Sequence, residues 1–230
     1  MRNRMRLLPT AIPQLLQVLA IAGCIVTIDA MGCQKDIAHA IVERGADYVL
    51  ALKANQPSLY EDVQWLFEQA LARQFQGIVH DFHQTLDKGH GRIEMRRCWT
   101  LSELAYLVQK PPWSGLTSLA MIQSERRSNG KVEHQTRYFI SSLTNGAKPI
   151  LEAVRSHWGI ENSLHWVLDV SFAEDDCRIR KDHAPQNFSL VRQIALNLLS
   201  QEKTTTAGVK AKRKKAGWDD AYLFKVLTQA

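Results

Sequence analysis

Residues 23–52, GCIVTIDAMGCQKDIAHAIVERGADYVLAL, decide the fold of this chain. An apolar, β-branched run at 23–29 ends in Asp29, an amphipathic helix is predicted over 33–44, and a second apolar run follows at 48–52. Such a strand–helix–strand unit is typical of a parallel α/β sheet. Asp29 would lie at the carboxyl end of its strand, where site residues are frequent, although an Asp there is also a common helix cap.

The chain around this unit predicts helices and a β-rich segment. Short β-like runs separated by glycine turns fill residues 76–143 and favour antiparallel strands. The other predicted elements are a helix at 14–22, a helix from Pro57 to about Arg73, helical sequence from about Lys148 to Phe172, a helix over 185–199, a solvated linker at 201–217 and a short helix at 216–227.

Composition favours a folded protein with an anionic partner. The 230 residues carry a net charge of +6, and the sequence pI is about 9.2. Nucleic acid is the commonest partner of such a chain. The four cysteines lack metal-finger spacing, which predicts reduced thiols in a cytosol.

The first 24 residues imitate a lipoprotein signal, because MRNRMR precedes an apolar run that ends in IAGC. Pro13, Gln14 and Gln17 interrupt that run, and it continues past Cys24 into a predicted strand. We therefore expect a helix rather than an export signal here, and no segment that spans a membrane.

Residues 157–176, HWGIENSLHWVLDVSFAEDD, predict a second element that could carry chemistry. His157, Glu161 and His165 are spaced by four, so a helix would place them along one face. Zinc could bind such a face, but the H-E-x-x-H order and a clear third ligand are missing. The apolar positions that predict a buried side for this helix are Ile160, Leu164, Val167, Leu168 and Phe172.

Six blocks of the chain resemble the ISAs1 group of insertion-sequence transposases, relatives of the IS4-like type and of the H-repeat-associated proteins. The blocks are VTIDAMGCQKDIA (26–38), DYVLALKANQP (47–57), DKGHGRIEMRR (87–97), TRYFISSL (136–143), HWGIENSLHWVLDVSFAEDD (157–176) and KRKKAGWDDAYLFKVL (212–227). They occur in the family's order, and the resemblance as a whole covers nearly everything from about Thr10 onward.

The resemblance implies a ribonuclease-H-like α/β core with a DDE triad, in which Asp29 is the second acid and Glu161 the third. In this chemistry the carboxylates hold two Mg²⁺ or Mn²⁺ ions, which cut transposon ends and join them to target DNA. The expected organisation is a leader and preceding helix at 1–22, the first part of the core at 23–75, a β-rich insertion at 76–145, the helical part of the core with Glu161 at 146–200, and a basic linker with a terminal helix at 201–230.

The chain departs from the family at its beginning. Residues 1–28 contain no Asp or Glu, so the position of the first acid cannot be filled, and we expect an N-terminally truncated, incomplete core that is inactive alone. Val154, His157 and Leu168 stand where IS4-type proteins have Tyr, Arg and Lys. The alternatives are a non-catalytic remnant that binds DNA or full-length transposase, and an inert reading frame.

Several polar and aromatic residues are candidates for DNA contact. Some follow a strand near the edge that carries Asp29, some form a basic glycine-flanked turn, and some flank Glu161. The candidates are Lys53, Asn55, His90, Arg92, Arg155, His157 and Trp158. Each also has a structural reading as a turn, hairpin or core residue, and the run Lys210–Lys215 is a DNA-binding tail or a solvated linker. Expected partners are terminal inverted repeats, target DNA, and a second copy or a full-length transposase, in a bacterial cytoplasm at the nucleoid.

Overall fold

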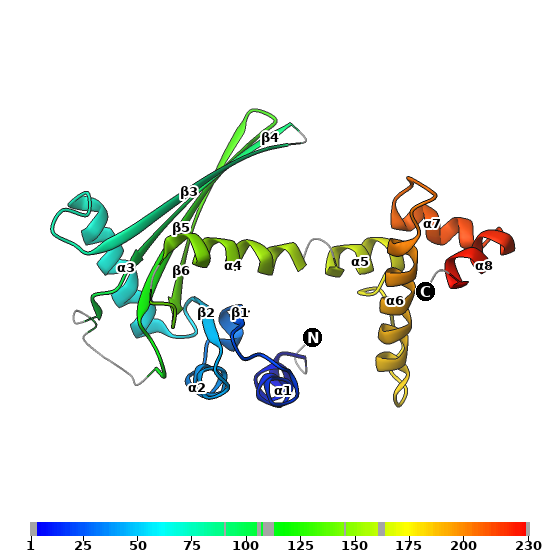
Figure 1. Cartoon of the computed structure of the whole chain (residues 1–230), viewed down its shortest axis with the longest axis horizontal. Coiled ribbons are helices and arrows are strands. Elements are labelled where there is room, and N and C mark those ends of the chain that lie inside the picture. Colours follow the sequence, from blue (N-terminus) through cyan, green and yellow to red (C-terminus); the bar gives the residue numbers. More distant parts are fainter. Residues whose placement is uncertain are drawn as a thin grey trace. The chain divides into compact units, whose positions relative to one another are not determined.

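The chain forms two compact units, residues 1–157 and 158–230, which we describe separately. The computed structural model (Figure 1) describes residues 4–89, 91–104, 107, 113–144, 146–160 and 164–228, with side chains from residue 11 onward. No helix in these ranges is long and apolar enough to cross a bilayer.

A six-stranded mixed sheet organises the first unit, with its strands in the order β1-β2-β6-β5-β4-β3. The parallel pair at one edge is joined through β6 to antiparallel hairpins, whose outer ends extend beyond the helices (Figure 1). The strands are β1 (Ile25–Ile28), β2 (Asp47–Leu52), β3 (His80–Gly89), β4 (Arg92–Leu101), β5 (Ser118–Ser128) and β6 (Lys131–Ser141). β1 is therefore an edge strand, and within the described residues only β2 pairs with it.

The predicted parallel unit and the antiparallel strands both form, but they belong to one sheet. β6 pairs with β2 from Val49 opposite Ser141 to Leu52 opposite Tyr138. The β-rich segment therefore continues the sheet that carries Asp29. The sequence did not indicate this continuity, because the pairing joins residues about ninety positions apart.

One face of the sheet is covered by helices α2 (Lys35–Glu43) and α3 (Pro57–Ala72). The apolar side of each helix packs against every second residue of the strands. Side chains of a strand alternate between its two faces, and those of a helix return to the same side every 3.6 residues. Tyr60 and Phe67 of α3 contact the ring of Tyr138, with ring centroids 5.7 and 6.0 Å apart. The fully buried members of this core include Ile37, Ile41, Tyr48, Leu50, Val63, Phe67, Leu119 and Ile140.

The opposite face carries α4 (Ala147–Ile160). Asp81 accepts a hydrogen bond from the Ala147 N–H at 2.9 Å, and Asp87 pairs with Arg155 at 3.0 Å. Phe82 lies on the α3 side of the sheet, where its ring packs against Trp99. Successive side chains of a strand point to opposite faces, so Asp81 and Asp87 point to the other face, and α4 lies there. Ile150, Leu151 and Val154 are buried along α4.

Helix boundaries differ from the sequence prediction at two places. The helix expected at 14–22 is α1, Arg4–Val18, because the chain turns after Val18 and the Cys24 N–H bonds to the Ile21 carbonyl. The helical sequence expected to Phe172 comprises α4 and α5 (Trp166–Phe172), and residues 161–163 lie outside the described part. Leu168 is buried as predicted, whereas Ile160 is exposed.

The second unit contains α5, α6 (Ala184–Gln201), α7 (Val209–Ala216) and α8 (Asp220–Thr228) around a small core of Leu199, Tyr222 and Val226. The prediction of a solvated linker over 201–217 is wrong for α7, which is helical and buries Lys212. The physical reason is Glu202, a fully buried carboxylate 3.4 Å from the Lys212 ammonium. A buried partner of opposite charge lets a lysine enter a core.

Candidate active site

Asp29 follows β1 at the carboxyl end of the parallel pair, as the sequence predicted. Its carboxylate pairs with the Lys53 ammonium at 3.4 Å, and Lys53 follows β2. Parallel strands end at the same edge, which brings these residues together although they are 24 positions apart. Both side chains are more than half exposed, so the pair itself adds little stability.

The surroundings of Asp29 favour its ionised form. Burial is the largest single influence and raises the pKa, but the Ala30 N–H, Lys53 and His157 together outweigh it and hold the pKa below the usual value. An aspartate with a lowered pKa is a carboxylate at neutral pH. Asp29 is therefore ready to receive a cation or to orient a polar ligand.

Further nitrogen groups reach this end of the sheet from elements distant in sequence. His157, near the end of α4, lies with Nδ1 3.1 Å from the Thr27 hydroxyl, two residues before Asp29. Arg137 of β6 also acts on Asp29: burial lowers the pKa of its guanidinium, and the Asp29 carboxylate opposes that shift. The sequence predicted His157 as a site residue but missed Arg137, which the alternation of TRYFISSL places on the face opposite Tyr138.

The turn after Asp29 is held by two amide side chains that follow β2. Asn55 donates a hydrogen bond to the Ala30 carbonyl, and Gln56 donates to the Cys33 carbonyl at 3.0 Å. Asn55, a candidate for DNA contact, thus has a positioning role that the sequence did not indicate. An open groove of about 490 Å³ borders this turn, lined by Met31, Gln34, Lys35, Asp36, Asn55 and Gln56.

Gly32 sets how closely this turn packs on β1. A Cβ atom there would lie 2.4 Å from the Ile28 side chain and 3.1 Å from that of Ile12. We expect Gly32→Ala to lower the free energy of unfolding by about 1–3 kcal/mol through overpacking. Urea denaturation measures this, and Gly89→Ala, where a Cβ meets nothing within 4 Å, is the control. Equal effects of the two substitutions would contradict the tight contact at Gly32.

Arg92 and Arg155, two further candidates for DNA contact, do not lie beside Asp29. Arg92 belongs to β4 and lies 4.0 Å from Glu94, and three strands separate β4 from β1. Arg155 shares Asp87 with Arg96, whose distance to that carboxylate is 2.7 Å. Trp158 belongs to the second unit and is partly buried, and His90 and Glu161 lie outside the described residues.

Comparison with known proteins identifies the family. Residues 6–198 match the family model described as "Transposase DDE domain", which covers most of the chain. The chain belongs to the DDE transposase family. Two relatives from Escherichia coli K12 are the YbfL protein, 41% identical over 225 residues, and "H repeat-associated putative transposase YhhI", 40% identical over 225 residues. Each alignment covers 95% of this chain and 58% of the relative, so the chain spans about three fifths of the relatives' length.

DDE transposases generally use divalent metal ions, and the described residues offer only part of such a site. Asp29 is a suitable hard oxygen ligand. Among the described residues, however, no three His, Cys, Asp or Glu side chains are grouped as a metal site requires. Within the described ranges of this DDE transposase chain, the Asp29 carboxylate can therefore serve as one ligand of a metal centre, and these ranges do not include Glu161.

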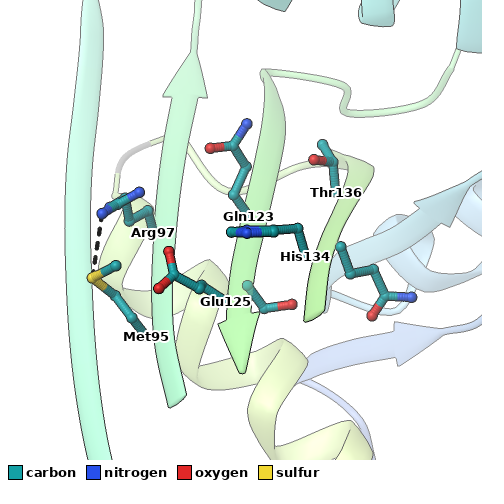
Figure 2. A pocket seen from close by; sticks show the side chains of 8 residues that line it. Met95, Arg97, Gln123, Glu125, His134 and Thr136 are labelled. Atoms are coloured by element: carbon teal, nitrogen blue, oxygen red, sulfur yellow. Dashed lines mark hydrogen bonds between the residues drawn. The ribbon is translucent and has the colours of Figure 1, made fainter. Parts of the chain in front are cut away.

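A small pocket of about 130 Å³ lies on the outer part of the sheet of this DDE transposase chain, away from Asp29 (Figure 2). Figure 2 shows Arg97, Glu125 and His134 on three adjacent strands, with Arg97 bonded to the Met95 sulfur at 3.3 Å. Thr136, which also lines it, alternates with Arg137, so the pocket opens on the face opposite the Asp29 site. It is therefore separate from the candidate active site.

Proposed function

We propose that this chain is an insertion-sequence transposase of the ISAs1 group, with Asp29 and Glu161 as the second and third acids of a ribonuclease-H-like DDE core. Family membership carries this proposal. The placement of Asp29 at the carboxyl end of a parallel strand, beside Lys53 and His157, supports it. Mg²⁺ or Mn²⁺ is the proposed metal of the complete family protein, where it would activate the attacking oxygen and stabilise the leaving one.

The substrate we propose is DNA at the inverted repeats of the element, followed by target DNA. Lys53, Arg137 and His157 would bind the phosphate backbone near Asp29, because cationic and donor groups position a DNA strand without reading its sequence. Asn55 and Gln56 would hold the turn that carries Asp29. Arg92, Arg155, Trp158 and His90 remain further proposed DNA contacts.

We further propose that the 230-residue chain does not cut DNA on its own. Residues 1–28 contain no Asp or Glu, so the chain offers no candidate for the first acid before Asp29. β1 also leaves one backbone edge without a partner strand among the described residues, which is an open position for pairing. The second proposed function is therefore a non-catalytic protein that binds element ends or full-length transposase.

Cleavage of inverted-repeat DNA tests the catalytic proposal. We expect the purified chain to leave that DNA intact with Mg²⁺ or Mn²⁺. Metal-dependent cutting that Glu161→Gln abolishes, while the exposed α4 control Glu152→Gln retains it, would overturn the inactivity and confirm the role of Glu161. A gel shift on element-end DNA across a salt series separates a binding protein from an inert reading frame, since only the former gives a retarded band.

A further inference from the structure

The second unit presents an ordered helix of positive charge that the candidate active site does not use. Residues 203–218 contain six Lys or Arg and no Asp or Glu, and α7 carries five of the six. Lys210, Arg213 and Lys214 are exposed. Within the described residues no carboxylate pairs with Lys210 or Lys214. The charge is therefore available to an external anion.

A buried lysine fixes which side of α7 faces outward. Lys212 is 7% exposed, pairs with Glu202 at 3.4 Å and donates to the Leu199 carbonyl at 3.3 Å. Glu202 also accepts a hydrogen bond from the Tyr222 hydroxyl at 2.8 Å, which joins α7 to α8. Positions two residues from Lys212 lie on the other side of the helix, so Lys210 and Lys214 point away from this anchor.

Lys210 and Lys214 are one turn apart on that outer side, about 6 Å along the helix axis. Like charges at this spacing repel and destabilise a helix in isolation. A bound polyanion would relieve the repulsion, and DNA places a phosphate about every 3.4 Å of axis along each strand. Two cations on one side of a helix can therefore contact neighbouring phosphates of one DNA strand.

Aromatic groups accompany the charges. Trp218 is 81% exposed and follows α7 by two residues. Arg213 lies over the Phe172 ring, 5.4 Å from its centroid, and Lys215 lies 4.3 Å from the centroid of Tyr222. These contacts restrain the flanking cations and leave the Trp218 indole as an exposed flat surface, which is a common partner of sugars and bases.

We propose that the outer side of α7, with Lys210, Lys214 and Trp218, is a second DNA-contacting surface of this protein, which binds the phosphate backbone independently of sequence. This inference rests on the proposed function for its choice of polyanion. An anionic membrane is the poorer fit, because Val209 and Ala216 of α7 pack into the core and leave no apolar side to insert into a bilayer.

Fluorescence anisotropy of a labelled DNA duplex of unrelated sequence, with EDTA present and across a salt series, tests the surface in the full chain. We expect Lys210→Glu with Lys214→Glu to weaken binding by roughly tenfold or more, and to reduce the slope of log affinity against log salt by about 2. Trp218→Ala should weaken binding without changing the slope, since it removes no charge. The charge-matched control is Arg73→Glu with Lys148→Glu, two exposed cations of the first unit.

Three results would overturn the proposal. The first is an unchanged salt slope in the Lys210→Glu, Lys214→Glu variant, and the second is an equal change in the control variant. The third is a Lys210→Glu, Lys214→Glu variant that binds DNA normally but no longer binds phosphatidylserine vesicles, which would indicate a membrane surface. Circular dichroism of each variant verifies folding, and the outward position of both lysines makes retained helicity the expected result. Because the duplex is unrelated to the element and metal is absent, failure here is distinguishable from failure of cleavage or end recognition.

Discussion

Replacing Phe67 with alanine is expected to lower the free energy of unfolding of the first unit by about 3–5 kcal/mol, the cost of an emptied aromatic site in a packed core. Phe67 is fully buried between α3 and the sheet, where its ring contacts Tyr138. That contact joins α3 to β6, the strand that connects the parallel pair to the antiparallel hairpins. The loss should therefore lower the urea midpoint of the whole unit.

Trp65 provides the matched control on the same helix. It is 56% exposed although it is two residues from Phe67, because residues two apart lie on different sides of a helix. Trp65→Ala should change the free energy of unfolding by about 0.5 kcal/mol or less, as exposed positions usually do. A comparable loss from both substitutions, measured by urea denaturation, would contradict the assignment of α3 to this face.

Local sequence pattern predicted the elements of the sheet better than their assembly. The parallel pair and its helix follow from the alternation and periodicity of residues 23–52, which are short-range properties. The pairing of β2 with β6 depends on residues far apart in the chain, and no turn signal marks it. Reading the antiparallel strands as an insertion therefore missed that they extend the same sheet.

The candidate site shows the same division. Asp29 and Lys53 were expected near one edge because parallel strands end together, and the structure brings them to 3.4 Å. The contact between Thr27 and His157 joins residues 130 positions apart, which periodicity alone does not predict. Arg137 was missed because the sequence pattern predicted its strand but not that β6 pairs with β2. That pairing brings Arg137 close enough to Asp29 to interact with it.

The prediction of a solvated linker over the basic run near the C-terminal end is wrong for a physical reason. A run of lysines is usually solvated, since burying an unpaired ammonium is costly. Here one lysine of the run meets a buried carboxylate, and the remaining cations become the outer side of a folded helix. The pattern could not show this, because Glu202 lies ten residues away outside the run.

Lys212→Met should therefore unfold α7 and α8 locally, whereas Lys210→Met on the same helix should not. Without its ammonium, Glu202 stays buried with no cation, the situation in which removing one partner of an ion pair is most costly. We expect hydrogen exchange of the α7 and α8 amides to speed up by roughly a hundredfold or more in Lys212→Met. The Thr204 and Tyr222 hydroxyls lower the pKa of Glu202 together with Lys212, and both remain in this variant, where they favour the ionised carboxylate. Adding Glu202→Gln should restore most of the protection, because a neutral amide can still bond to the Thr204 N–H and the Tyr222 hydroxyl. If the double variant exchanged as fast as Lys212→Met alone, lost packing of the lysine stem, rather than an uncompensated charge, would explain the effect.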